Sequence, residues 1–159
     1  MSTDRRVLVH ADRAALATAA ADRFLTTMGR LLDERAEVHT VLTGGSVGIE
    51  VLAAIAAHPQ RDSIDWARVH AWWGDERWVP AGDPDRNDRQ AREALLQFVA
   101  MPARNIHSFP SSDEGIDLEA AAARYDEELR RAGDGDYPAL AITFLGVGPD
   151  GHIASLFPE

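Results

Sequence analysis

The sequence predicts an α/β domain with a mostly parallel sheet. Three observations lead to this fold class: short apolar runs alternate with segments of helical periodicity, turn residues close each run, and the intervening segments are long enough for crossover helices. The chain has 159 residues, the size of one ordinary domain with its own core. We therefore expect a single domain over residues 1–159.

The first half of the chain predicts two strand–helix units. In order, we expect a strand at 6–10, a helix from 12 to about 35, a strand at 38–42 and a helix at 47–57. Asp12 is a suitable N-cap for the first helix. Pro59 ends the second helix, because the residue before a proline disfavours the helical region.

The second half repeats the pattern around a longer loop. We expect a strand at 69–73, a loop at 74–87 rich in Gly, Pro and Asp, a helix at 88–99, a strand at 106–109, a helix at 117–132 and a strand at 139–145. The last run contains no charged residue, as is typical of strands covered on both faces. It is therefore predicted to be the most clearly buried strand.

Composition excludes several classes of chemistry. The net charge is −10, which disfavours binding to nucleic acid or to anionic membranes. All 16 basic residues are Arg, so a Schiff-base or P-loop lysine is excluded, and the absence of Cys excludes thiolate catalysis. A chain without disulfides, signal-peptide core or membrane-length apolar run is expected to be cytoplasmic.

The unusual residues follow strands. Three loops at 43–46, 74–77 and 146–152 each come directly after an expected strand. In open parallel sheets, ligands bind beyond the carboxyl ends of the strands. We therefore expect these loops to converge on one site.

The first loop has the composition of an anion-binding turn. It consists of Thr43, Gly44, Gly45 and Ser46. Glycines let the backbone approach a ligand closely, and the following helix offers free N–H groups and the positive end of its dipole. The alternative is a tight turn in which Ser46 serves only as an N-cap.

The second loop places opposite charges beside tryptophans. Asp75 and Glu76 precede Arg77, whose planar guanidinium suits a phosphate. The alternative is a surface ion cluster, which contributes little unless it is screened from water.

The third loop offers acid–base chemistry. His152 lies in a glycine-rich segment, two residues after Asp150. A histidine can accept and return a proton near neutral pH, and a nearby carboxylate can hold its tautomer. The other five histidines lie on expected strands or at helix ends, where structural roles are expected.

The sequence predicts no metal site. The segment starting at Asp83 begins like a calcium loop, but Asp88 and Ala94 stand where Gly and Glu are required. No pair of histidines has the spacing of a zinc site.

Taken together, the motifs resemble a known family. The segments 43–46, 73–80 and 146–158, which read TGGS, WGDERWVP and GVGPDGHIASLFP, are similar in order and spacing to 6-phosphogluconolactonases. The wider group includes glucosamine-6-phosphate deaminases. Arg77 after Asp-Glu, and the SLFP that follows His152, resemble the lactonase pattern.

The resemblance implies a Rossmann-like three-layer α/β/α fold and hydrolysis of 6-phospho-D-glucono-1,5-lactone in the oxidative pentose phosphate pathway. On this reading, residues 43–46 and Arg77 bind the phosphate, Asp75 contributes to substrate binding, and His152 with Asp150 performs catalysis. No cofactor is implied. We expect a small-molecule partner, and a monomer or a homodimer.

Two features depart from the family pattern. The chain ends at Glu159, soon after the histidine motif, which suggests a C-terminally truncated sequence, and Arg86 stands where the family usually has Ser. Two alternatives therefore stay open. One is an amino-sugar-phosphate isomerase or deaminase with Asp75 as the base, and the other is a catalytically silent sugar-phosphate-binding module.

Overall fold

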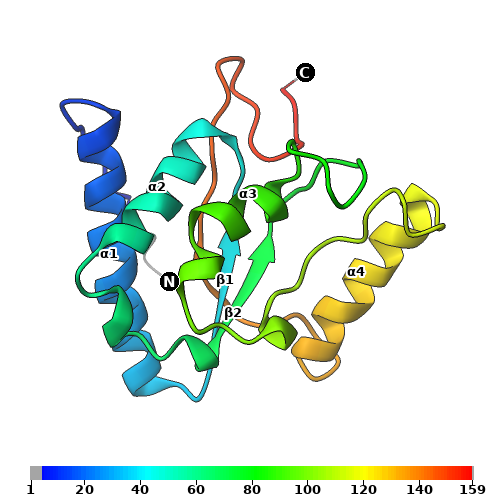
Figure 1. Ribbon diagram of the computed structural model, residues 1–159, viewed down its shortest axis with the longest axis horizontal. Helices are drawn as coiled ribbons and strands as arrows, with labels where there is room; N and C mark the ends of the chain where they lie inside the picture. The colour runs from blue at the N-terminus through cyan, green and yellow to red at the C-terminus, as the bar shows by residue number, and fades with distance from the viewer. Residues whose placement is uncertain (1–4, 159) are drawn as a thin grey trace.

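The computed structural model describes residues 5–158 and is organised around a parallel sheet (Figure 1). Within that range the sheet has three strands, β1 (Val38–Leu42), β2 (Val69–Trp73) and β3 (Leu140–Thr143), in the order β2–β1–β3. Both pairings are parallel. The carboxyl ends of the strands therefore lie at the same edge of the sheet.

Helices cover both faces of the sheet. The helices α1 (Arg13–Glu34), α2 (Gly45–Ala57) and α3 (Asn87–Ala94) contribute to the core on one face. The helix α4 (Leu118–Ala132) lies on the other side of β2 and contributes Tyr125 to a second core (Figure 1). The result is the predicted three-layer α/β/α arrangement of Rossmann-like domains.

The period-two alternation of strands divides their side chains between the two cores. Val69 and Trp73 pack in the first core, whereas Val41 and Trp72 pack with Tyr125 in the second. The Tyr125 hydroxyl accepts a hydrogen bond from the Trp73 amide at 3.0 Å and donates one to the Trp73 carbonyl at 3.3 Å. Through this side chain α4 is attached to the sheet.

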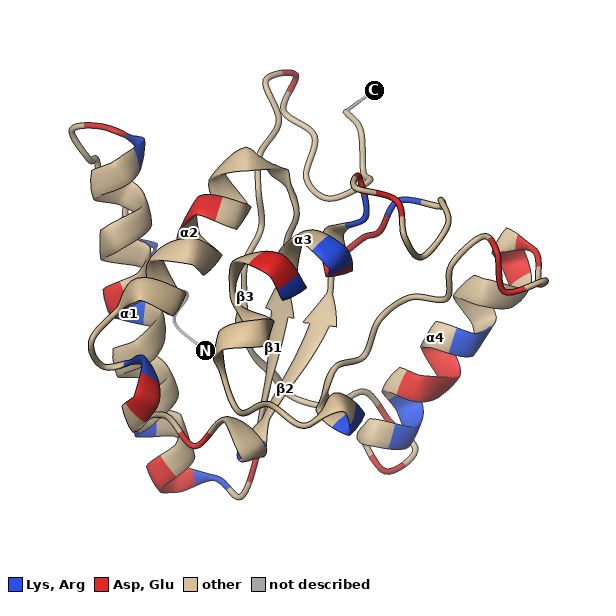
Figure 2. Ribbon diagram, viewed as in Figure 1, with Lys and Arg blue, Asp and Glu red and all other residues tan. Residues whose placement is uncertain are grey.

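Short 3-10 helices complete the connections. They comprise Arg61–Ser63, Trp66–Arg68, Leu96–Phe98 and Ala103–Asn105. Charged residues lie on the helices and loops, while the strands carry none, as Figure 2 shows. Over residues 5–158, no helix is both long and apolar enough to cross a membrane.

The prediction of a strand at 6–10 is wrong. Residues 6–10 form no strand, and the side chains of Val7 and Val9 are 81% and 91% exposed. A strand requires a hydrogen-bonded neighbour. None of the three described strands pairs with this segment, so its apolar pattern alone does not produce a strand.

The predictions for the strands at 106–109 and 139–145 are also wrong in part. The segment 106–109 forms only one bridge, from Ile106 to Ala71, and is not a full strand. The last strand is shorter than predicted, at Leu140–Thr143, and its residues are half-buried or exposed instead of being the most buried. The reason is its position, because β3 pairs with β1 alone and forms an edge of the described sheet.

The remaining elements agree with the predictions apart from their ends. The strands β1 and β2 have the predicted bounds, and Asp12 caps α1 by accepting a hydrogen bond from the Ala15 amide. The predicted helix at 88–99 ends at Ala94 and continues as a 3-10 turn.

Candidate active site

The three predicted loops meet at a cavity of about 520 Å³ beyond the carboxyl ends of the strands. All four residues of the 43–46 loop line it, together with Asp75, Arg77 and His152. Asp150 does not line the cavity, but it contacts His152 from behind. The cavity also includes Asn87 and Ala154, for which the sequence alone predicts no role.

The first loop presents the amino end of α2 to the cavity. The helix begins at Gly45, so Gly44 is the N-cap, and the alternative with Ser46 as N-cap is wrong. Among residues 5–158, no side chain caps this helix end. The amides of the first turn are therefore oriented toward the cavity as hydrogen-bond donors, at the positive end of the helix dipole.

Asn87 joins the first loop to the second. Its Nδ2 donates to the Asp75 carbonyl at 3.0 Å, and its side chain lies against Gly44. A Cβ atom on Gly44 would lie 1.9 Å from Asn87 Oδ1, which is far inside van der Waals contact. Glycine is required here because a buried side chain from α3 occupies the space.

Glu76 is a structural residue of the second loop. Its side chain is only 4% exposed and accepts hydrogen bonds from the amides of Arg77, Asn87 and Asp88 at 2.7, 2.7 and 3.0 Å. It therefore caps the amino end of α3. This capping fixes Asn87, and through Asn87 the two loops.

Arg86, the departure from the family pattern, belongs to the same buried group. Its guanidinium lies 3.7 Å from a Glu76 carboxylate oxygen and donates to Asp88 Oδ1 at 3.0 Å and to the Phe109 carbonyl at 2.9 Å. At 2% exposure, this side chain does not reach the cavity. The substitution therefore supports the loop from inside the protein.

The other two charges of the second loop face the cavity. Asp75 Oδ2 accepts a hydrogen bond from the Ser155 hydroxyl at 2.8 Å. The Arg77 side chain is exposed, and within residues 5–158 its guanidinium forms no hydrogen bond or ion pair. Because no ion pair joins the two residues, Arg77 has its donors available for a ligand.

The tryptophans near this loop do not shield it as a group. Trp73 and Trp72 are buried in the first and second cores. Trp78 lines a smaller, mostly apolar cavity of about 270 Å³ that Asp75 and Arg77 border as well. Arg77 therefore lies between a polar cavity and an apolar one.

His152 is held by its own loop. Its Nδ1 contacts Asp150 Oδ1, and its amide donates to the same oxygen at 3.3 Å. The ring packs so closely on Gly148 that a Cβ there would lie 2.1 Å from the imidazole Cε1. Because Nδ1 faces Asp150, Nε2 is the atom available for proton transfer.

Asp150 is suited to this supporting role. Hydrogen bonds from the His152 side chain and amide lower the pKa of Asp150 below its ordinary value. The carboxylate therefore stays ionised through the range in which imidazoles titrate. An ionised partner holds the proton on Nδ1 and stabilises the imidazolium.

Some residues of the site were not assigned from the sequence. Asn87, Glu76 and Ser155 connect the loops. Glu76 and Ser155 lie within the motifs that resemble the family, but the motifs alone do not predict these contacts. The start of a helix after a loop with Gly, Pro and Asp was the one available signal for Asn87.

Comparison with known proteins shows the family of this chain. Residues 11–159 match the family model described as glucosamine-6-phosphate isomerases/6-phosphogluconolactonase. The chain belongs to this family. It is 46% identical to the 6-phosphogluconolactonase of Streptomyces coelicolor, over all of this chain and 63% of that protein, and 43% identical to that of Mycobacterium tuberculosis, over 93% and 61%.

A solved structure of a 6-phosphogluconolactonase has a similar fold. The crystal structure of 6-phosphogluconolactonase from Thermotoga maritima superposes with a TM-score of 0.78 at 31% identity, over 89% of this chain and 60% of that chain. The chain thus spans less than two thirds of the length of these relatives.

Proposed function

We propose that this protein hydrolyses 6-phospho-D-glucono-1,5-lactone to 6-phospho-D-gluconate in the oxidative pentose phosphate pathway. The observation that carries the proposal is the single cavity lined by the amino end of α2, Arg77 and His152. Family relatives named 6-phosphogluconolactonase support the choice of substrate.

In this proposal the phosphate binds between the 43–46 loop and Arg77. The amides at the start of α2 donate hydrogen bonds to the anion without competition from a side-chain cap, and Arg77 supplies a fork of donors. Binding energy from the phosphate then holds the lactone carbonyl near His152. Asp75, held by Ser155, contributes an acceptor for a sugar hydroxyl.

The chemical step requires one base and one water molecule. Nε2 of His152 takes a proton from water as the water oxygen attacks the lactone carbonyl carbon. The tetrahedral intermediate then breaks the bond between this carbon and the ring oxygen, which receives the proton from the imidazolium. The product is the open-chain acid, which ionises, and the imidazole is neutral again.

The test is hydrolysis of freshly prepared 6-phosphogluconolactone by the purified chain, with the spontaneous rate subtracted. We expect His152→Ala to lower kcat by about 10²–10⁴-fold. The unfolding midpoint should hardly change, since the ring is partly exposed. Asp150→Asn is expected to lower kcat less, because Asp150 acts through His152.

Two results would contradict the proposal. One is a folded chain with no rate above background, and the other is a His152→Ala variant with unchanged kcat. Glucosamine 6-phosphate is the control substrate, since ammonia release from it would favour the deaminase alternative, in which Asp75 is the base.

We also propose that the protein acts in the cytoplasm as an enzyme for a small molecule. The lack of cysteine fits a reducing compartment, and the net charge of −10 disfavours nucleic acid as a partner.

A further inference from the structure

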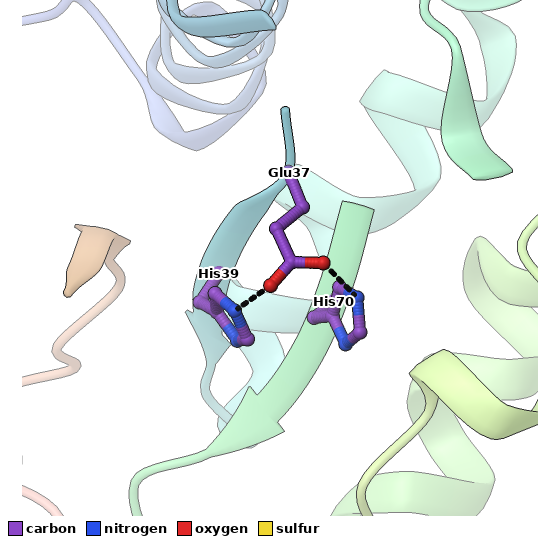
Figure 3. A group of neighbouring side chains, drawn as sticks. All are labelled: Glu37, His39 and His70. Atoms are coloured by element: carbon purple, nitrogen blue, oxygen red, sulfur yellow. Dashed lines mark hydrogen bonds and ion pairs between the residues drawn. The ribbon is translucent and has the colours of Figure 1, made fainter. Parts of the chain in front are cut away.

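A group of imidazoles and carboxylates lies at the opposite end of the sheet from the cavity. Glu37 directly precedes β1, and His39 and His70 are the second residues of β1 and β2. The two histidines are register partners in the parallel pairing, with ring centroids 4.5 Å apart. Figure 3 shows the Glu37 carboxylate between both rings.

The two carboxylate oxygens of Glu37 contact different rings. Glu37 Oε1 lies 3.3 Å from His39 Nε2, and Glu37 Oε2 lies 3.5 Å from His70 Nε2. Ordinary N–H···O bonds span about 2.7–3.2 Å. Two ligand atoms at about 2.0–2.1 Å from a tetrahedral metal would lie about 3.3–3.4 Å apart. One ligand atom from each of Glu37, His39 and His70 lies within 4.8 Å of the other two, so a small movement of the side chains would bring them around one ion.

His70 is arranged as a metal ligand by the residues behind it. His107 Nδ1 lies 2.6 Å from Glu128 Oε1, and its Nε2 lies 2.9 Å from His70 Nδ1. If Glu128 is ionised and both imidazoles are neutral, each Nδ1 carries the proton that it donates. The Nε2 atom of His70 is then unprotonated, and its lone pair faces a Glu37 oxygen.

Two acceptors that face each other repel unless a proton or a metal cation lies between them. The relay from His70 through His107 to Glu128 is the outer shell that ligating histidines ordinarily have. We propose that Glu37 and His70 bind a divalent transition metal ion of the zinc type, with His39 as a weaker third ligand.

His39 is the weaker ligand because of Trp72. The indole Nε1–H can only donate, and it lies 3.0 Å from His39 Nδ1, so Nδ1 must accept. A neutral His39 then carries its proton on Nε2, the atom that faces Glu37. Metal binding at this nitrogen must displace that proton, and Trp72 therefore opposes coordination by His39.

The site is accessible from solvent and distinct from the catalytic cavity. The Glu37 side chain is 55% exposed, while His39 and His70 lie beneath it at 8% and 17%. A bound ion would tie β1 to β2 and, through His107 and Glu128, to α4. The sequence-based prediction of no metal rested on a failed calcium-loop match and on histidine spacing. Neither criterion detects ligands that strand pairing brings together.

The first experiment is calorimetric titration of Zn²⁺ and of Co²⁺ into the chain without a histidine tag. We expect one ion per chain and a higher unfolding midpoint, reversed by a chelator. His70→Asn should weaken binding more than the roughly 10–100-fold that loss of an outer-shell partner costs. No binding to the unaltered chain would overturn the proposal.

Matched variants localise the site. His58→Asn removes another histidine paired with a carboxylate, Asp22 at 2.7 Å, and His152→Asn removes the catalytic one. Both should retain the ion, and a loss equal to that of His70→Asn would overturn the assignment. Glu128→Gln should weaken binding about tenfold, while Glu127→Gln, the exposed neighbour, should not.

Trp72 provides the sharpest test. Trp72→Phe removes the indole donor, frees His39 Nδ1 to carry the proton, and is expected to tighten binding several-fold, with a thermal melt to confirm folding. Unchanged or weaker binding in the folded variant would overturn the role of His39. If the variant does not fold, His39→Asn decides, because the proposal requires a measurable loss smaller than that of His70→Asn.

Discussion

Two groups of opposite charges come from the loop after β2, and they lie in contrasting surroundings. Glu76 and Arg86 are 4% and 2% exposed, and each makes several hydrogen bonds within the protein. Asp75 and Arg77, the immediate neighbours of Glu76, face the cavity instead. Asp75 has one side-chain bond, from Ser155, and Arg77 has none within residues 5–158.

The buried pair and the exposed pair are suited to different tasks, the first to positioning the loop and the second to binding a ligand. A buried carboxylate that accepts three amides holds the backbone in one conformation, and a cation beside it offsets the cost of burial. An exposed guanidinium without a protein partner keeps its donors for a ligand.

Glu76→Ala is expected to have the largest effect. It leaves three amides without their acceptor and removes one partner of buried Arg86, which costs about 3–5 kcal/mol. Denaturant unfolding measures this loss. Glu93→Ala, which breaks the exposed pair with Arg89 on α3, is the control. Equal losses in the two variants would refute the structural role of Glu76.

Arg77→Ala is expected to act on binding instead. Loss of charged hydrogen bonds worth about 1.5–3 kcal/mol should raise KM for the phosphorylated lactone about 10–150-fold. The unfolding free energy should not change. Arg131→Ala, an exposed arginine at the end of α4, is the control. The phosphate assignment fails if an unphosphorylated lactone suffers the same loss.

Gly44→Ala tests the contact between the loops. The added Cβ must displace the Asn87 side chain, and overpacking of this kind costs about 1–3 kcal/mol. Both stability and activity should fall. Gly82→Ala is a matched control because no atom of the described part of the chain lies within 4 Å of its Cβ position. Similar stabilities of the two variants would argue against a tight contact at Gly44.

Ser155→Ala should have the smallest effect. It removes one hydrogen bond to Asp75, worth about 0.5–1.5 kcal/mol, between partly exposed groups. We expect a rise in KM of less than about tenfold, with kcat nearly unchanged. A loss as large as that of Arg77→Ala would mean that Ser155 contacts the substrate itself.

Local patterns were sufficient for much of the fold. The bounds of β1 and β2 were predicted correctly because each is a short apolar run closed by turn residues. Asp12 was identified as a cap because capping involves residues three apart. The segment 6–10 failed because pairing, and not apolar character, makes a strand.

For the site, too, some features follow from local sequence and others from tertiary contacts. The sequence by itself determined the three loops, their glycines and the charged side chains that they carry, since turn chemistry and helix starts depend on neighbouring residues. Only the tertiary structure decided that Glu76 is buried while Asp75 is not, that Asn87 fills the space beside Gly44, and that His39 lies beside His70. These outcomes depend on pairing and burial between residues distant in the chain, and a local pattern contains no information about such partners.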